Sequence, residues 1–285
     1  IYRKRRNKMA NDFKSTAWLA EHLQDDNLRI VDIRGHVLPA SQPPPHYFSH
    51  RDKYDQSHIP NAVFVDWTTD IVELESPTYD VVSPERFATL MSRLGISNDT
   101  TVIVYDDANG MFAARFWWVM SYYGHESVFV LEGGWQKWQA ENHPTTDSVP
   151  TLVETIYTPL VNPDLCADLA SINANQPQLI DVRSPAEYAG EASRAQRKGH
   201  IPNAINLPRK TLLNTDGTLK PIDELKTMFS EAGIRTDAEN TVVYCNSGVS
   251  ATYGLLALRA AGIQNVRVYD SSWKEWGNRD DTPIE

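Results

Sequence analysis

The chain repeats itself, and this internal duplication limits the possible fold more than any other feature of the sequence. Four blocks recur in the same order: an apolar segment ending in Asp-x-Arg, a His-Ile-Pro-Asn-Ala block, a Thr-Val-rich apolar segment, and a Trp-x-x-Trp block. Equivalent residues lie 149 positions apart at the first block (Asp32 and Asp181) and 138 positions apart at the last (Trp135 and Trp273), so the separation changes little. Blocks that keep their order at nearly one offset indicate two copies of one domain.

The two copies are expected to span residues 10–142 (copy one) and 160–285 (copy two), each of a common domain size. Between them, residues 143–159 hold three prolines and a polar stretch without periodicity, as in a linker. Residues 1–8 are basic and precede Met9, which has the form of a natural start. We therefore interpret residues 1–8 as a non-native extension, with a basic arm or a targeting segment as the alternative.

Short apolar strands alternate with helices in both copies. We expect strands at 28–33, 101–105, 128–131, 179–182, 241–244 and 266–269, and helices at 84–94, 113–123, 223–232 and 251–261. Strands without strict apolar–polar alternation, separated by helices, favour a parallel sheet covered on both faces. The predicted fold class is therefore α/β, with tandem domains that each contain a parallel sheet flanked by helices. Functional loops then lie at the carboxyl ends of the strands.

Cys245 occupies such a loop, directly after the strand at 241–244 and before the helix at 251–261. There a thiol faces backbone N–H groups and the positive end of the helix dipole. Both favour the thiolate, so we predict a nucleophilic cysteine whose pKa lies below that of a free thiol. The alternative is a small, inert core residue. Copy one has Asp106 at this position. A carboxylate cannot perform sulfur chemistry, so copy one is expected to support the fold and shape the substrate site.

Composition excludes several classes of function. The net charge of −10 argues against general binding to nucleic acid or anionic membranes, and no apolar run approaches membrane-spanning length. The only cysteines, Cys166 and Cys245, allow at most one disulfide, which fits a reducing, cytoplasmic environment. We expect Cys166 to be structural, at the start of a helix. No cysteine–histidine metal pattern, P-loop or dinucleotide fingerprint is present, so neither a cofactor nor a metal is expected.

With the repeat, both His-Ile-Pro-Asn-Ala blocks and the Cys245 loop assembled, the chain resembles the two-domain rhodanese family of sulfurtransferases. The match covers nearly all of residues 10–285, with Asn61 and Ser271 in place of usual glycines. The resemblance implies that Cys245 accepts a sulfane sulfur from a small-molecule donor as a persulfide. A thiol or cyanide then takes that sulfur, and thioredoxin is one candidate acceptor. A monomer or weak dimer is expected.

The residues after the cysteine bear on the donor. Thiosulfate rhodaneses carry two basic residues there, whereas this loop is similar to that of the 3-mercaptopyruvate sulfurtransferases. The resemblance thus favours 3-mercaptopyruvate, with thiosulfate as the alternative. It also implies that a histidine of copy one, His58, supports the loop serine, and it places Glu187 where the family has an arginine. The candidate substrate-binding residues are Asn246, Ser247, Gly248, Val249, Ser250, Arg183, Arg194, Arg197 and His58.

Three alternatives stay open. Arg183 could instead be a fold-stabilising partner of a carboxylate, because copy one has Arg34 in the same place. A cysteine phosphatase would need Cys-x5-Arg, whose arginine grips phosphate, but Ala251 stands at that position. The chain could also be a non-catalytic, rhodanese-like binding or regulatory module, against which the retained cysteine and complete loop argue.

Overall fold

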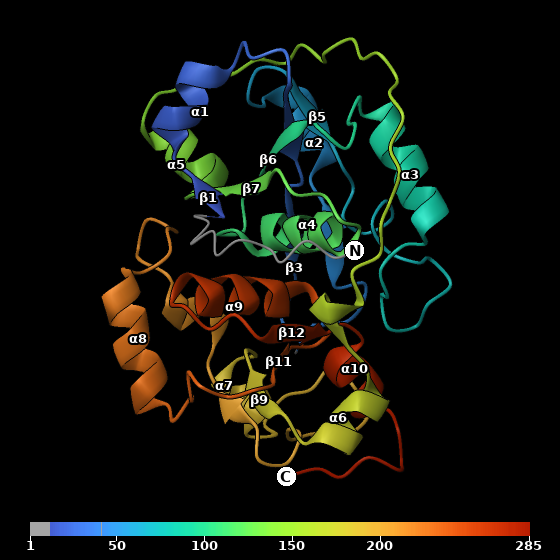
Figure 1. Ribbon diagram of the computed structural model, residues 1–285, viewed down its shortest axis with the longest axis vertical. Coiled ribbons are helices and arrows are strands. Elements are labelled where there is room, and N and C mark those ends of the chain that lie inside the picture. Colours follow the sequence, from blue (N-terminus) through green and yellow to red (C-terminus); the bar gives the residue numbers. More distant parts are fainter. Residues whose placement is uncertain (1–11, 41) are drawn as a thin grey trace.

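The computed structural model describes residues 12–40 and 42–285, so the expected extension at residues 1–8 lies outside the described part. The chain forms two α/β halves, one above the other in Figure 1. None of the described helices is long and apolar enough to cross a membrane.

The first half contains one mainly parallel sheet, a small antiparallel hairpin and five helices among the described residues. Its strands are β1 (Phe13–Lys14), β2 (Leu28–Asp32), β3 (Gly35–Val37), β4 (Tyr47–Ser49), β5 (Ala62–Phe64), β6 (Thr101–Tyr105) and β7 (Val128–Leu131). Its helices are α1 (Thr16–His22), α2 (Arg51–Gln56), α3 (Pro84–Arg93), α4 (Met111–Tyr122) and α5 (Gly134–Ala140).

The second half repeats this order, without a described counterpart of the hairpin. Its strands are β8 (Cys166–Ala167), β9 (Gln178–Asp181), β10 (Ile205–Asn206), β11 (Thr241–Tyr244) and β12 (Val266–Tyr269). Its helices are α6 (Leu169–Asn175), α7 (Pro185–Tyr188), α8 (Ile222–Glu231), α9 (Val249–Ala260) and α10 (Ser272–Trp276), with 3₁₀ turns η1 (Pro163–Leu165) and η2 (Arg209–Leu212).

The two sheets have the same topology. Strand order is β1-β7-β6-β2-β5 in copy one and β8-β12-β11-β9-β10 in copy two, and every neighbouring pair is parallel. The α/β prediction of tandem parallel sheets flanked by helices is therefore confirmed. Because strand residues alternate between faces, Ile30 and Ile103 contribute to one apolar core while Val31 and Val104 contribute to another.

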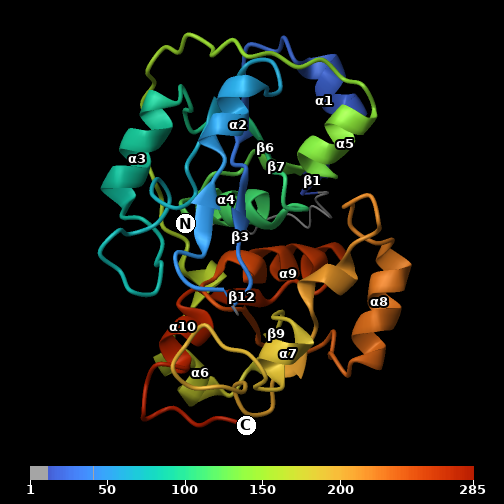
Figure 2. The ribbon, with the colours of Figure 1, turned by 180° about the vertical axis from the view of Figure 1, so that it is seen from behind.

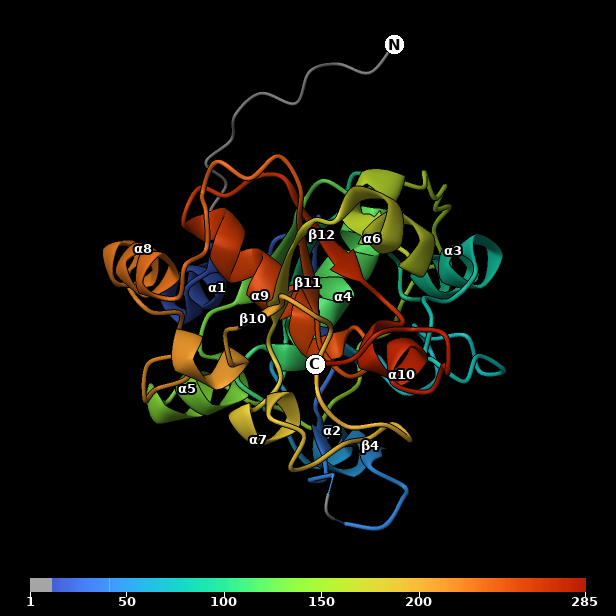
Figure 3. The ribbon, with the colours of Figure 1, turned by 90° about the horizontal axis from the view of Figure 1, so that it is seen from below.

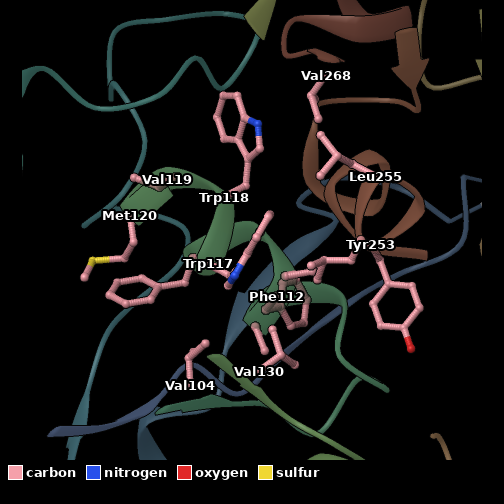
Figure 4. Packing of buried hydrophobic residues seen from close by; sticks show 14 of the residues in the cluster. Val104, Phe112, Trp117, Trp118, Val119, Met120, Val130, Tyr253, Leu255 and Val268 are labelled. Atoms are coloured by element: carbon pink, nitrogen blue, oxygen red, sulfur yellow. The ribbon is translucent and has the colours of Figure 1, made fainter. Parts of the chain in front are cut away.

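One apolar cluster runs through both copies. In it, α4 and α9 pack side by side between the sheets, as Figures 1 and 4 show with Phe112 and Trp117 from α4 and Tyr253 and Leu255 from α9. The helices approach closely at Gly110, where an added Cβ would lie 2.7 Å from a ring carbon of Tyr253. A shared core of this kind fixes the two halves against each other, so residues of copy one can shape a site in copy two.

The β3–β4 hairpin is one of the parts of copy one that lie near copy two, and Figure 2 shows β3 directed toward α9. In the view from below, β4 lies at the edge of the molecule near α2 and α7 (Figure 3). A hydrogen bond of 2.6 Å from Arg194 to the carbonyl of Leu38, in the loop after β3, joins the two halves here.

Several expected boundaries differ from the structure by one or two residues; α4, for example, begins at Met111 rather than at 113. Helix α9 begins at Val249 rather than at 251, because Gly248 adopts the left-handed conformation (φ 71°) that turns the chain into the helix. Cys166 begins strand β8 rather than a helix, so that expectation is wrong: the preceding turn η1 leads into an edge strand that pairs with β12 as β1 pairs with β7. The expected domain limits at 142 and 160 stay a prediction.

Candidate active site

Cys245 lies at the carboxyl end of β11 and is 3% exposed. Its backbone is held on both sides by the start of α10. The N–H of Cys245 donates to Oγ of Ser272 at 3.1 Å, and its carbonyl accepts from the N–H of Trp273 at 3.0 Å. The cysteine therefore projects from a backbone position fixed by the neighbouring strand–helix connection.

The loop that follows wraps around the sulfur. The backbone N–H groups of Ser247, Ser250 and Ala251 lie near the Cys245 sulfur and favour its thiolate form. Only glycine fits at Gly248, because a Cβ there would lie 2.3 Å from Oδ1 and 2.7 Å from the carbonyl of Asp270. The loop is thus a cradle of inward-pointing amides at the N-terminus of α9, suited to hold a negatively charged atom.

Copy one shows what this cradle can hold. The buried carboxylate of Asp106 accepts hydrogen bonds of 2.7–2.9 Å from four backbone N–H groups in the equivalent loop and helix start. These donors belong to Ala108, Gly110, Phe112 and Ala113. A carboxyl group whose two oxygens both accept from backbone N–H groups therefore occupies the place that corresponds to the thiol of Cys245. Burial raises the pKa of Asp106 and these N–H groups oppose that shift, so the loop of copy one favours the anionic form of the group that it holds.

The protonation state of the thiol differs from the expectation. Burial raises the pKa of Cys245 above its ordinary value, and the amides of Ser247, Ser250 and Ala251 only partly oppose that effect. The predicted depression of the pKa is therefore wrong, because desolvation of the thiolate outweighs the loop amides. Below that raised pKa the neutral thiol dominates.

The raised pKa predicts how the reactivity of Cys245 changes with pH. We expect its rate of alkylation by iodoacetamide to keep rising above pH of about 8.5, the range of a free thiol, because only the thiolate is the nucleophile. Reaction at Cys245 can be followed by peptide mass spectrometry, with Cys245→Ser as the background. A rate that levels off near neutral pH would contradict the raised pKa.

Copy one supplies an aromatic wall beside the loop. The hydroxyl of Tyr47, on β4, lies close to the side chain of Ser247. Tyr79 packs edge-on against Tyr47, with ring centroids 4.9 Å apart, and Nζ of Lys274 lies 3.9 Å from the Tyr79 ring centroid. Sequence reasoning missed these residues, because Tyr47 and Tyr79 lie in copy one, far from Cys245 in the chain.

Arg209 is a second residue that the sequence did not single out. It lies on η2, is 8% exposed, and donates to the carbonyl of Asn109 at 3.0 Å. Burial lowers its pKa, and the neighbouring Asp106, Tyr253 and Cys245 only partly oppose that shift. A buried basic side chain thus lies within electrostatic range of both loops. No motif marks it, since η2 reaches Cys245 through the folding of copy two and reaches Asn109 through the packing of the halves.

Arg183 is engaged in the fold. Its side chain is fully buried and donates to both carboxylate oxygens of Asp181 at 2.6–3.0 Å and to the carbonyl of Gly199 at 2.9 Å. The guanidinium lies 4.4 Å from the ring centroid of Trp273. These contacts favour the fold-stabilising alternative over contact with the donor.

The same arrangement recurs in the half without the cysteine. Arg34 pairs with Asp32 at 2.8 Å, donates to the carbonyl of Ser57 at 2.7 Å, and lies 4.4 Å from the Trp135 ring centroid. An identical set of partners in copy one indicates a shared structural role, and it supports that interpretation of Arg183.

The other two predicted arginines, Arg197 and Arg194, have different surroundings. Arg197 donates to the carbonyls of Thr282 and Trp276, both at 2.9 Å, and so fastens the C-terminal segment. The guanidinium carbon of Arg194 instead lies 6.0 Å from the ring centroid of Tyr47, whose hydroxyl lies close to Ser247. The structure thus brings Arg194 near the loop that follows Cys245, whereas Arg197 holds the C-terminal segment.

His58 does not support the loop serine. It is fully buried, stacks on Tyr54 with centroids 4.0 Å apart, and its ring nitrogens lie 2.7 and 3.2 Å from the carbonyls of Tyr54 and Ser148. That expectation is wrong for two reasons. Both ring nitrogens of His58 lie at hydrogen-bond distance from backbone carbonyls. The side chain of copy one that lies close to Ser247 is Tyr47. His58 therefore joins the linker to copy one.

The remaining loop residues have distinct surroundings. Asn246 donates from Nδ2 to Oε1 of Glu187 at 2.8 Å, and Val249 packs into the apolar cluster shared by the halves. The hydroxyl of Ser250 lies 3.2 Å from Sδ of Met111 in copy one. No group of three or more His, Cys, Asp or Glu side chains that could hold a metal ion occurs within residues 12–40 and 42–285.

Comparison with known proteins gives consistent results. The family described as "Rhodanese-like domain" matches residues 15–141 and 167–279. The chain is 36% identical over 287 residues to "Sulfur carrier protein TtuD" of Thermus thermophilus, covering 95% of each chain. It is 38% identical over 247 residues to "Putative thiosulfate sulfurtransferase" of Haloferax volcanii, covering 82% of this chain and 85% of that protein.

A solved structure agrees with these relatives. The crystal structure of SseA from Escherichia coli, described as having the rhodanese fold of 3-mercaptopyruvate sulfotransferases, superposes with a TM-score of 0.82. The two sequences are 34% identical, and the match covers 93% of this chain and 99% of that one.

Proposed function

This chain belongs to the rhodanese family of two-domain sulfurtransferases, and on that premise we propose that it moves a sulfane sulfur through a persulfide on Cys245, with 3-mercaptopyruvate as the preferred donor. The observation that carries the proposal is the amide cradle around Cys245, whose counterpart in copy one holds a carboxylate. A persulfide that carries negative charge on its outer sulfur needs such donors.

The first half-reaction loads the enzyme. The Cys245 thiolate attacks the donor sulfur and forms an S–S bond while the donor's C–S bond breaks. The electron pair stays on carbon as the enolate of pyruvate, which takes up a proton. With thiosulfate, the donor's S–S bond breaks instead and sulfite leaves with the pair. The loop amides of Ser247, Ser250 and Ala251 stabilise the anionic sulfur in each case.

The second half-reaction unloads it. An acceptor thiolate or cyanide attacks the outer sulfur, the S–S bond of the persulfide breaks, and its electron pair returns to Cys245. The acceptors are small thiols, cyanide or a dithiol protein of the thioredoxin kind, and ping-pong kinetics follow from the two separate half-reactions. The two free cysteines suit a reducing compartment, and we place the enzyme in the cytoplasm on that basis.

The donor preference follows from the charge of the loop. Asn246 and Ser247 offer hydrogen bonds but no positive charge beside Cys245. Thiosulfate is a compact dianion and gains most from two cations at the sulfur, whereas the carboxylate of mercaptopyruvate can lie farther out. Losing a charged contact costs about 1–2 kcal/mol, so we expect kcat/KM for 3-mercaptopyruvate to exceed that for thiosulfate by at least about tenfold.

Thiocyanate formation with each donor and cyanide measures this preference directly. Similarity to a relative named as a putative thiosulfate sulfurtransferase supports thiosulfate as the second candidate donor. A higher kcat/KM with thiosulfate would reject mercaptopyruvate as the preferred donor and leave the persulfide mechanism standing. No transfer with either donor would favour a non-catalytic binding module.

A further inference from the structure

Glu187, which stands where the family has an arginine, contacts the residue after the cysteine. Asn246, the residue after the cysteine, donates from Nδ2 to Oε1 of Glu187 at 2.8 Å. Glu187 is the N3 residue of α7, where its other oxygen accepts from the N–H and hydroxyl of Ser184 at 3.2 and 2.7 Å. The carboxylate is therefore held in one position, directly against the catalytic loop.

Glu187 carries negative charge at neutral pH. Although burial acts to raise its pKa, the hydrogen bonds from Ser184 and Asn246 and the charge of Arg194 together lower it. Its side chain is only 13% exposed, so water screens its charge less than on an open surface.

The nearest cation to this carboxylate is Arg194, whose Nε lies 3.7 Å from Oε1 of Glu187. The guanidinium also donates from Nη2 to the carbonyl of Leu38 at 2.6 Å and lies near the Tyr47 ring. Its Nη1 is buried without a hydrogen-bond partner among the described residues. Arg194 thus has a free donor beside the loop, while part of its charge is offset by Glu187.

We propose that Glu187 is a specificity-determining residue: held by Asn246, its carboxylate offsets the charge of Arg194 and weakens the binding of sulfur donors in proportion to their negative charge. This inference rests on the proposed function and deepens it. A dianion such as thiosulfate meets twice the repulsion of a monoanion at the same distance. A donor without charge is unaffected. Glu187 then adds to the discrimination between donors that the uncharged loop after Cys245 already provides.

The variant Glu187→Gln tests the effect of the negative charge by itself. Glutamine keeps an oxygen that can accept from Asn246, and it suits the N3 position of a capping box. We expect KM for thiosulfate to fall about tenfold and KM for 3-mercaptopyruvate about threefold, a scale typical of one partly buried charge contact. The changes in kcat should be smaller than those in KM. Mercaptoacetone, which lacks the carboxylate, should show a KM changed by less than about twofold.

Two further variants serve as controls. Glu191→Gln removes an equal charge from an exposed residue of the same segment, and it should leave both KM values within about twofold. Asn246→Ala removes the hydrogen bond but keeps both charges, so it should not reproduce the fall in KM.

These measurements distinguish a failure of the inference about Glu187 from a failure of the proposed function. A KM for anionic donors that stays constant or rises in Glu187→Gln, or one that falls equally for mercaptoacetone, would overturn the role of Glu187. Persulfide formation on Cys245 of the wild type, read by intact-mass spectrometry, tests the underlying function independently. If the wild type forms the persulfide and Glu187→Gln binds anions no better, only the inference about Glu187 fails.

Discussion

Replacing Cys245 with serine is expected to lower sulfur transfer at least about a thousandfold, because a hydroxyl in this cradle cannot form a persulfide. The fold should persist, since the exchange of one sulfur for oxygen leaves the backbone contacts with Ser272 and Trp273 in place. After treatment with donor, the wild type should gain one sulfur, about 32 Da, and the variant none.

Cys166 provides the matched control. Burial raises its pKa to about 12, and it lies on the edge strand β8, so its thiol is a poor nucleophile. Cys166→Ser should retain the added mass and most of the activity. Sulfur found mainly on Cys166, or substantial transfer by Cys245→Ser, would refute the assignment of the nucleophile.

Replacing Arg183 with alanine is expected to lower the free energy of unfolding by about 3–5 kcal/mol, because the carboxylate of Asp181 would stay buried without its partner. Arg34→Ala should cost a similar amount, since the Arg34–Asp32 pair in copy one has the same geometry. Arg194→Ala should cost less stability than Arg183→Ala, because Glu187 keeps its hydrogen bonds from Ser184 and Asn246, and it should raise KM for anionic donors.

Urea denaturation followed by tryptophan fluorescence measures the stability changes, and donor titrations of the folded variants measure KM. If Arg183→Ala were as stable as the wild type but bound donor weakly, Arg183 would be a donor-binding residue after all. A large difference between the Arg183 and Arg34 variants would argue against equivalent roles for the two pairs.

The sequence predicted the fold well because the duplication shows each element twice. The strands at 101–105, 128–131, 241–244 and 266–269 lie where expected, since apolar β-branched runs between turn residues are strong local signals. The position of Cys245 between strand and helix was likewise a local signal. Helix α9 started two residues early because the conformation of one glycine decided it.

The surroundings of the cysteine were harder to predict. Tyr47 reaches the site through the packing of the two halves and Arg209 through the folding of η2 within copy two, and no spacing in the sequence encodes either approach. His58 and Arg197 were predicted to contact substrate, but each side chain instead lies against backbone carbonyls of a segment that folds back onto it. The direction of the Cys245 pKa shift was missed because burial cannot be judged from loop composition alone.

The carboxylate of Asp106 has a consequence for stoichiometry. Its four hydrogen bonds fill the anion site of copy one with a group that cannot dissociate, and those four donors are satisfied without any molecule from solution. In a duplicated enzyme, a single residue can therefore make one of two equivalent centres inactive. The half that carries this residue stays folded and continues to support the other half. At saturation, this chain should carry one transferable sulfur rather than two.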